Sequence, residues 1–159
     1  MYFFRGGEGR LVKPQALAVS ATGIVAVADV EKVDLFGPDG TFLSSVGVSG
    51  KEPGELRRPV AVAFGGNGAL FVADASNECV NKYNANGGFE GKQVGNIAPL
   101  AMAADGEGRV YVLDDIGPRL RVFDENLEPI LAAGTEGWDI PALAKSKTMA
   151  LAGDVLWIQ

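Results

Sequence analysis

The sequence predicts an all-β fold made of repeated four-stranded antiparallel units, and three observations carry that prediction. First, one plan occurs three times: a proline, a short apolar run, a turn with glycine, a second apolar run and a closing aspartate. The copies are PQALAVSATGIVAVAD (14–29), PVAVAFGGNGALFVAD (59–74) and PLAMAADGEGRVYVLD (99–114). Second, they begin 45 and 40 residues apart, a period typical of propellers and related arrays of short strands. Third, 22 of the 159 residues are glycine, as a turn-rich fold requires.

Each copy of this plan predicts the first two strands of a unit. The apolar run after the proline is the first strand, and the glycine turn leads into the second. The second runs are apolar at every position, at 24–27, 70–73 and 110–113. Such a run suits a strand in the middle of a sheet that is covered on both faces.

The residues after each closing aspartate predict two further strands. They read KVDLFGPDGTFLSSVG (32–47), CVNKYNANGGFEGKQVG (79–95) and RLRVFDENLEPILAAG (119–134). Each holds an alternating run that ends in an aromatic residue (Phe36, Tyr83 or Phe123), then a polar turn and a fourth run. Short runs separated by Gly, Asn and Asp are the hairpin signal, and four such strands make one β-propeller blade. We expect the recurring aromatic residues to pack between blades.

The two ends of the chain predict incomplete blades. Residues 4–14 resemble residues 46–59, with glycines, a leucine and a basic residue before proline, and residues 148–159 match the opening half of a unit. The expected organisation is one partial propeller domain over residues 1–159. It comprises the end of a preceding blade (1–13), blades over 14–58, 59–98 and 99–146, and a half blade over 147–159.

The repeating pattern resembles the NHL-repeat family of β-propellers along nearly the whole chain. In that family a strand ending in Val-Ala-Asp is followed by Asn-His-Arg/Lys, and residues 72–77, VADASN, fit this form. Glu78 and Cys79 replace the usual histidine and basic residue, whereas Lys32 and Arg119 keep a basic residue in the other units. The resemblance implies a ring, most often of six blades, in which the motif residues are structural.

An incomplete ring leaves two blade faces and one strand edge without partners, and such surfaces invite association. Three outcomes stay open, in decreasing order of expectation. The chain is a fragment of a longer propeller, or two chains form one ring in which the leading strand of one completes the half blade of the other. In the third, the chain closes as four compact blades with residues 1–5 as an outer strand.

The composition of the chain limits the classes of partner that we expect it to bind. With 14 Lys and Arg against 20 Asp and Glu, the net charge of −6 argues against a nucleic-acid partner, which needs a basic face. The adjacent pair Arg57 and Arg58 is read as solvated loop charge. No apolar run is long enough to cross a bilayer, so we expect no membrane insertion. The single cysteine, Cys79, excludes an internal disulfide and is expected to be buried. The compartment is not indicated.

The chain has no histidine, which removes a Ser-His-Asp triad, a His-ligated zinc site and a His general base. Residues 65–68, GGNG, lack the Lys-Ser/Thr of a phosphate-binding loop and are read as a hairpin turn. We therefore expect no catalytic residues, no metal and no cofactor in this chain, and incline against an enzyme.

The repeating aspartates Asp29, Asp74 and Asp114 have two interpretations. In the structural one, which we favour, each carboxylate caps backbone N–H groups of the next turn or pairs with a following basic residue, such as Lys32 or Arg119. In the functional one they form a carboxylate ring that binds calcium, which requires several oxygens converging on one ion.

The two tryptophans differ in their expected roles. Trp157 lies in a mid-blade strand and is expected in the core. Trp138 lies in the irregular stretch TEGWDIPALAKSK (135–147), which replaces the regular connection between blades. Trp138 and Asp139 are therefore the candidate recognition loop, with packing under a longer loop as the alternative.

Two functional hypotheses follow. The first is a non-catalytic scaffold that presents loops at one end of the propeller to a protein, a peptide or a glycan. The alternative is part of a six-bladed lactonase-like or lyase-like enzyme, with a metal in the central channel and most catalytic residues in blades absent here. The innermost strands are mostly Ala, Val, Leu and Met, which favours packing over chemistry.

Overall fold

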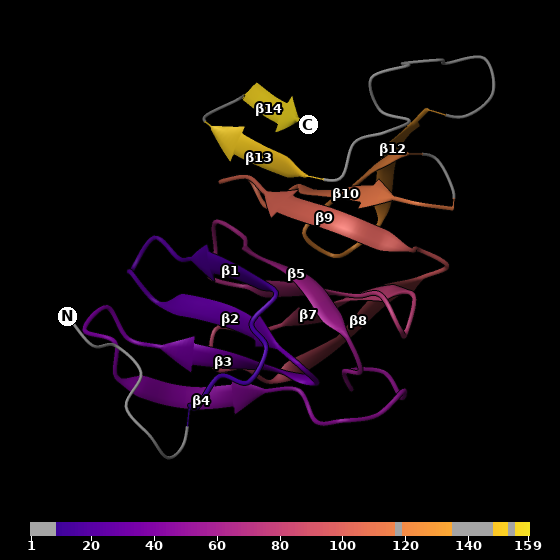
Figure 1. Ribbon diagram of the computed structural model, residues 1–159. Helices are drawn as coiled ribbons and strands as arrows, with labels where there is room; N and C mark the ends of the chain where they lie inside the picture. Colours follow the sequence, from indigo (N-terminus) through magenta and orange to yellow (C-terminus); the bar gives the residue numbers. More distant parts are fainter. Residues whose placement is uncertain (1–8, 117–118, 135–147, 153–154) are drawn as a thin grey trace.

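The computed structural model describes residues 9–116, 119–134, 148–152 and 155–159. Their strands form three four-stranded antiparallel sheets and one two-stranded sheet, each in sequence order (Figure 1). Blade 1 holds β1 (Ala16–Val19), β2 (Val25–Asp29), β3 (Lys32–Phe36) and β4 (Phe42–Val46). Blade 2 holds β5 (Pro59–Phe64), β6 (Leu70–Asp74), β7 (Cys79–Tyr83) and β8 (Phe89–Gly95). Blade 3 holds β9 (Pro99–Ala104), β10 (Val110–Asp114), β11 (Leu120–Phe123) and β12 (Pro129–Ala133), and the half blade holds β13 (Met149–Ala152) and β14 (Val155–Ile158).

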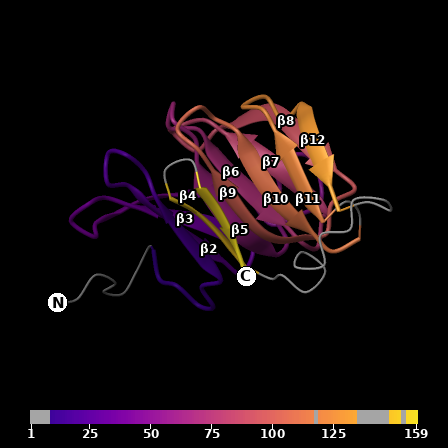
Figure 2. The same cartoon turned by 90° about the horizontal axis from the view of Figure 1, so that it is seen from above.

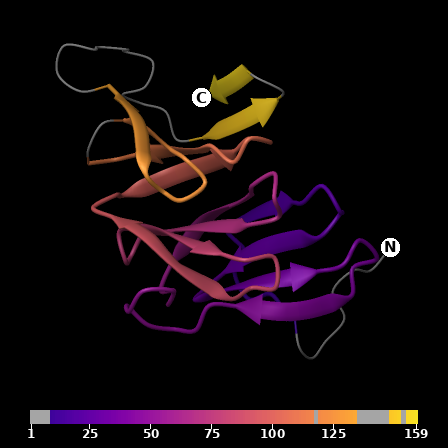
Figure 3. The ribbon, with the colours of Figure 1, turned by 180° about the vertical axis from the view of Figure 1, so that it is seen from behind.

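The blades lie in a row in which each first strand contacts the first strand of the next blade. β1 contacts β5, β5 contacts β9, and β9 contacts β13. Seen from behind, the half blade lies at the opposite end of the row from blade 1 (Figure 3), and seen from above it lies in front of the other blades (Figure 2). This arrangement of antiparallel blades confirms the predicted all-β propeller fold.

The second strands of the three four-stranded blades are deeply buried, as their uniformly apolar sequences predict. All five residues of β6 are buried, because clusters of side chains cover both faces of blade 2. One cluster lies between blades 1 and 2, with Val33, Val72 and Tyr83 among its members. The other lies between blades 2 and 3 and includes Phe71 and Phe123.

The recurring aromatic residues are buried, and Tyr83 and Phe123 belong to the clusters between blades, as predicted. Phe36, Tyr83 and Phe123 each follow a register shift between the third and fourth strands of their blade. The shift sets Phe36 against Phe42 and Tyr83 against Phe89 as edge-to-face ring pairs, with centroids 5.9 and 5.8 Å apart. The same irregularity therefore closes the outer hairpin of each blade.

The outermost faces of the row are apolar and exposed. Leu17 of β1 is 67% exposed, and Val19 is exposed beside it. The prediction that Trp157 lies in the core is wrong, because it is 64% exposed. In β14, Val155 and Trp157 are exposed while Leu156 and Ile158 are partly buried, since this terminal hairpin is covered on one face alone.

Candidate functional site

The repeating carboxylates are the first candidates for chemistry, and Asp29 shows how they are used. The Asp29 carboxylate is fully buried and accepts hydrogen bonds from the backbone N–H of Val12 (2.6 Å), Lys13 (2.5 Å) and Val30 (3.0 Å). Burial acts to raise the pKa of Asp29, but these N–H groups and the charge of Lys32 outweigh it, so its pKa lies below the usual value. The carboxylate thus joins the entry segment of blade 1 to the end of β2.

Asp74 repeats this arrangement with more donors. It accepts from the N–H of Arg57 (2.6 Å) and Arg58 (3.1 Å), which lie 17 and 16 residues before it, as Val12 and Lys13 do before Asp29. It also accepts from the N–H of Ser76 and Asn77, both at 2.9 Å.

Asp114 keeps part of the arrangement and replaces the rest. It accepts from the N–H of Ala98, 16 residues earlier (2.9 Å), and of Ile116 (3.1 Å). The amide of Ile97, one residue before Ala98, bonds to backbone instead, and Arg121 Nη2 lies 2.7 Å from Asp114 Oδ2. The structural interpretation is confirmed in all three blades: each carboxylate accepts backbone N–H groups, and in blade 3 the second oxygen of Asp114 faces Arg121 instead.

The basic partners differ from those predicted. Lys32 Nζ lies 2.6 Å from Asp34 Oδ2, and Arg119 Nη1 lies 2.9 Å from Asp115 Oδ1. Lys32 therefore acts on Asp29 through its charge while its ion pair is with Asp34, and in blade 3 Arg121 takes the place on Asp114 that was expected for Arg119. Of the basic residues, Arg121 is the one that the structure places on Asp114.

The linker between blades 1 and 2, residues 47–58, is fixed by polar side chains of blade 2. Asn77 Nδ2 donates to the carbonyls of residues 50 and 55, at 3.0 and 3.2 Å, and the Tyr83 hydroxyl donates to that of residue 54 at 2.9 Å. Burial raises the pKa of the Tyr83 phenol. In the same strand, Cys79 is buried as predicted, and burial together with the nearby Asp74 raises the pKa of its thiol to about 11.

Exposed valines surround a cleft at the end of β2 where the repeating aspartate lies. The cleft has a volume of about 390 Å³, and its lining includes Val12, Val30 and Val48. Val12 and Val48 are 75% and 65% exposed. We call these three residues the valine patch. Exposed apolar side chains gathered around a hollow are characteristic of binding surfaces.

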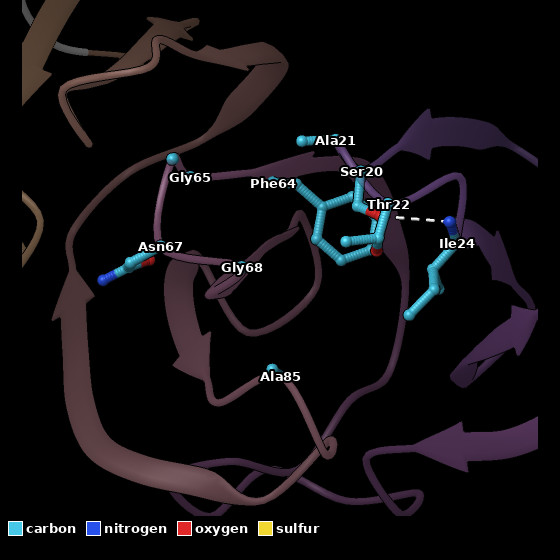
Figure 4. Close-up of a pocket in the computed structure, with 10 residues that line it drawn as sticks. Ser20, Ala21, Thr22, Ile24, Phe64, Gly65, Asn67, Gly68 and Ala85 are labelled. Carbon is cyan, nitrogen blue, oxygen red and sulfur yellow. Dashed lines mark hydrogen bonds between the residues drawn. The ribbon is translucent and has the colours of Figure 1, made fainter.

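A second pocket lies at the other end of β2, between the β1–β2 turn and the β5–β6 turn (Figure 4). We call it the seam pocket. It has a volume of about 300 Å³, and none of the described residues that line it is charged: its walls are Ser20, Ala21, Thr22, Ile24, Phe64, residues 65–68 and Ala85. Figure 4 shows the Phe64 ring beside Ser20 and Thr22, with Ile24 on the same side.

Sequence reasoning missed both surfaces. Phe64 ends its strand at a position where the other units carry Val19 and Ala104, and this irregularity was the available signal for the seam pocket. The valine patch joins positions distant in the sequence and had no such signal. The predicted recognition loop, Trp138 and Asp139, lies outside the described residues, and its role stays a prediction.

The corresponding turn of blade 3 carries charge. Arg109 Nε donates to Asp105 Oδ2 at 2.5 Å, and the Tyr111 hydroxyl donates to the same oxygen at 3.1 Å. Burial acts to raise the pKa of Asp105, but these two donors outweigh it, so its pKa is lowered.

Among the residues with described positions, no group of three or more His, Cys, Asp or Glu side chains is arranged to hold a metal ion. Nor does any helix in that part of the chain have the length and apolar character needed to span a membrane.

Comparison with known proteins supports the fold. No family model matches the chain. Protein brain tumor of Drosophila melanogaster is 30% identical over 125 residues, which cover 75% of this chain and 12% of that protein.

Solved structures share the fold at low sequence identity. Virginiamycin B lyase from Staphylococcus aureus superimposes with a TM-score of 0.69 at 11% identity, over 91% of this chain and 47% of that one. The WD40 repeats of RRP9 give 0.69 at 13% identity, over 91% and 43%. Kuenenia stuttgartiensis hydrazine synthase gives 0.65 at 15% identity, over 91% and 42%. The chain therefore spans less than half the length of each of these structures, and they establish its fold alone.

Proposed function

We propose that this chain is part of an NHL-repeat β-propeller that acts as a non-catalytic interaction module for a protein or peptide. Three units in one phase and the similarity to Protein brain tumor, an NHL-repeat protein, support the family. The chain covers 47% and 43% of two propeller structures, virginiamycin B lyase and the WD40 repeats of RRP9, which supports a larger ring, and we propose six blades as in the family.

The observation that carries the binding role is the valine patch. The neighbouring carboxylate, Asp29, is occupied by backbone N–H groups and is not available for chemistry. The exposed valines line the cleft together with charged and polar residues, among them Glu31, Lys32, Ser45 and Ser49. Apolar side chains interspersed with charged and polar ones are also found at protein interfaces.

Selection from a phage-displayed library of random linear peptides on the immobilised chain tests this role. We expect recovered peptides to bind Val48→Asp at least about tenfold more weakly than wild type, because the aspartate places a charge in the apolar cleft. The matched control is Leu43→Asp, which changes another exposed apolar residue away from the cleft and should leave binding intact. Recovery of no binder, or of binders that tolerate Val48→Asp, would contradict the proposal.

The exposed apolar faces at the two ends of the row support our proposal of a longer propeller. We propose that these faces, with Leu17 at one end and Trp157 at the other, pack against the remaining blades of a longer propeller. Light scattering on the 159-residue chain tests this, since an isolated piece should self-associate through these faces. A stable dimer would instead favour a ring built from two chains, and a cooperatively folding monomer would favour a ring closed by one.

The enzymatic alternative, a lactonase-like or lyase-like propeller, has weaker support. It rests on the fold that the chain shares with virginiamycin B lyase at 11% identity, a level that shows fold alone. Its metal ligands would have to come mostly from other blades. Within the described residues, the three repeating aspartates are already committed to holding linkers.

A further inference from the structure

We propose that the seam pocket is a second binding site, and that its ligand is the side chain of a tyrosine in a polypeptide. The site lies at the opposite end of β2 from the valine patch, so the inference does not depend on the proposed function. Four observations support it: an opening that the seam between blades 2 and 3 lacks, an aromatic wall, a pair of hydroxyl groups and the absence of charge among the described lining residues.

The opening is not a general property of neighbouring blades. At the seam between blades 2 and 3 the equivalent turns touch, because a Cβ added to Gly66 would lie 2.0 Å from the carbonyl oxygen of Gly106. Asn67 Nδ2 also donates to Glu125 Oε2 at 3.3 Å, which ties the blade 2 turn to blade 3. The blade 2 turn therefore leans toward blade 3, and the pocket remains on its blade 1 side.

Phe64 provides the aromatic wall. It packs at the edge of the cluster between blades 1 and 2, yet its ring is only partly buried and borders the pocket (Figure 4). The equivalent residue at the sealed seam is Ala104, which leaves no ring there. A partly buried ring that lines the pocket together with Ile24 favours an aromatic guest, since aromatic pairs prefer offset or edge-to-face contact.

Two hydroxyl groups in the pocket favour a ligand whose ring carries a hydrogen-bonding group. Ser20 Oγ accepts a hydrogen bond from the Ile24 N–H (3.0 Å) and lies 3.0 Å from Thr22 Oγ1. One proton is used between the two hydroxyls, so Thr22 Oγ1 retains capacity for a further bond. A phenol hydroxyl, which both donates and accepts, matches this pair.

The volume of the pocket and the charge of its lining further limit the side chains that it could bind. A cavity of roughly 150 Å³ accommodates benzene in a protein core, so about 300 Å³ is enough for a substituted ring and part of its backbone. Since the lining residues that the structure describes carry no charge, a carboxylate or ammonium group would lose its hydration there without a partner. The pocket therefore favours tyrosine over charged side chains of similar length.

N-acetyltyrosinamide, an uncharged probe, tests the site by NMR titration of the full chain. We expect saturable shifts confined to residues 20–24 and 64–68, and binding at least about tenfold weaker to Ala85→Leu, which fills the pocket from an exposed turn. The matched control is Asn86→Leu, a change at the adjacent exposed residue that does not line the pocket, and it should bind like wild type.

A second variant and probe test the chemical class. Thr22→Val should abolish any preference for N-acetyltyrosinamide over N-acetylphenylalaninamide while the chain stays folded. Shifts that are absent, that scatter over the surface or that persist in Ala85→Leu would overturn the proposal. Equal binding of the two probes to wild type would overturn the assignment to tyrosine. Because Val48 lies at the other end of β2, Val48→Asp should leave this binding unchanged, which separates failure here from failure of the proposed function.

Discussion

The Asp74 carboxylate is predicted to be a major determinant of stability in blade 2. Asp74→Ala removes an acceptor that serves the backbone N–H groups of four residues, Arg57, Arg58, Ser76 and Asn77. A hydrogen bond to a charged group contributes about 1.5–3 kcal/mol, so simple addition would give about 6–12 kcal/mol. That sum is comparable with the whole stability of a domain, and it overestimates the loss because water can reach amides on the linker. We expect a loss of about 3–5 kcal/mol, the range for breaking a buried charged interaction.

Urea unfolding followed by circular dichroism measures this change, with the free energy obtained by linear extrapolation. The matched control is Asp124→Ala, because Asp124 also accepts two backbone N–H bonds, from Asn126 and Glu128, but in an exposed turn. It should cost no more than about 1 kcal/mol. Asp114→Ala should fall between the two, since it frees two amides and leaves the partly exposed Arg121 able to turn to solvent.

The slope of free energy against urea concentration should stay unchanged in all three variants, since the folded and unfolded surfaces remain the same. The reasoning would be refuted if Asp74→Ala destabilised the chain no more than Asp124→Ala. Such a result would mean that the linker amides are hydrated equally well without the carboxylate.

Three further predictions concern other parts of the fold. Gly66→Ala should cost about 1–3 kcal/mol in the same unfolding assay, because its Cβ would meet the Gly106 carbonyl, whereas Gly106→Ala, whose Cβ meets nothing within 4 Å, should be nearly neutral. The Cys79 thiol, with its pKa raised to about 11, should resist iodoacetamide at pH 8 and react only on unfolding; rapid labelling of the native chain would contradict its burial. The lowered pKa of Asp29 means that its contribution is complete above the unfolded value of 3.8 and is lost as the pH falls through the lower folded value. Asp29→Asn should therefore lose less stability than wild type between pH 5 and pH 2, and equal losses would show that this carboxylate does not couple to folding.

The repeat in the sequence was sufficient to predict the propeller strands, because residues in the same phase experience the same surroundings in successive blades. Phe36, Tyr83 and Phe123 are buried for this reason. Trp157 shows where the argument fails: its strand repeats correctly, but burial also requires a neighbour on both faces, and β14 has one on a single face.

The seam pocket and the valine patch depend on residues that depart from the repeat. The position of a residue within the repeat does not predict the consequence of such a departure. Phe64 stands where the other units have smaller residues, yet its consequence depends on how the next turn leans, and that is set by the contact between Gly66 and Gly106. The valine patch arises because the entry segment and the exit segment of blade 1 meet near Asp29. Neither meeting is local in the sequence, so composition and periodicity could not reveal it.

The hydrogen bonds of the repeating aspartates also define which segment of the chain is a self-contained structural repeat. Each carboxylate reaches back 16 or 17 residues to amides that precede the proline at which the sequence repeat begins. A gene segment duplicated from Pro59 onward would separate Asp74 from the amides of Arg57 and Arg58. A segment that starts at Arg57 would contain both the carboxylate and these two amides. The physical module is thus offset from the visible repeat, and a designed consensus array should place its junctions before Arg57 and its equivalents.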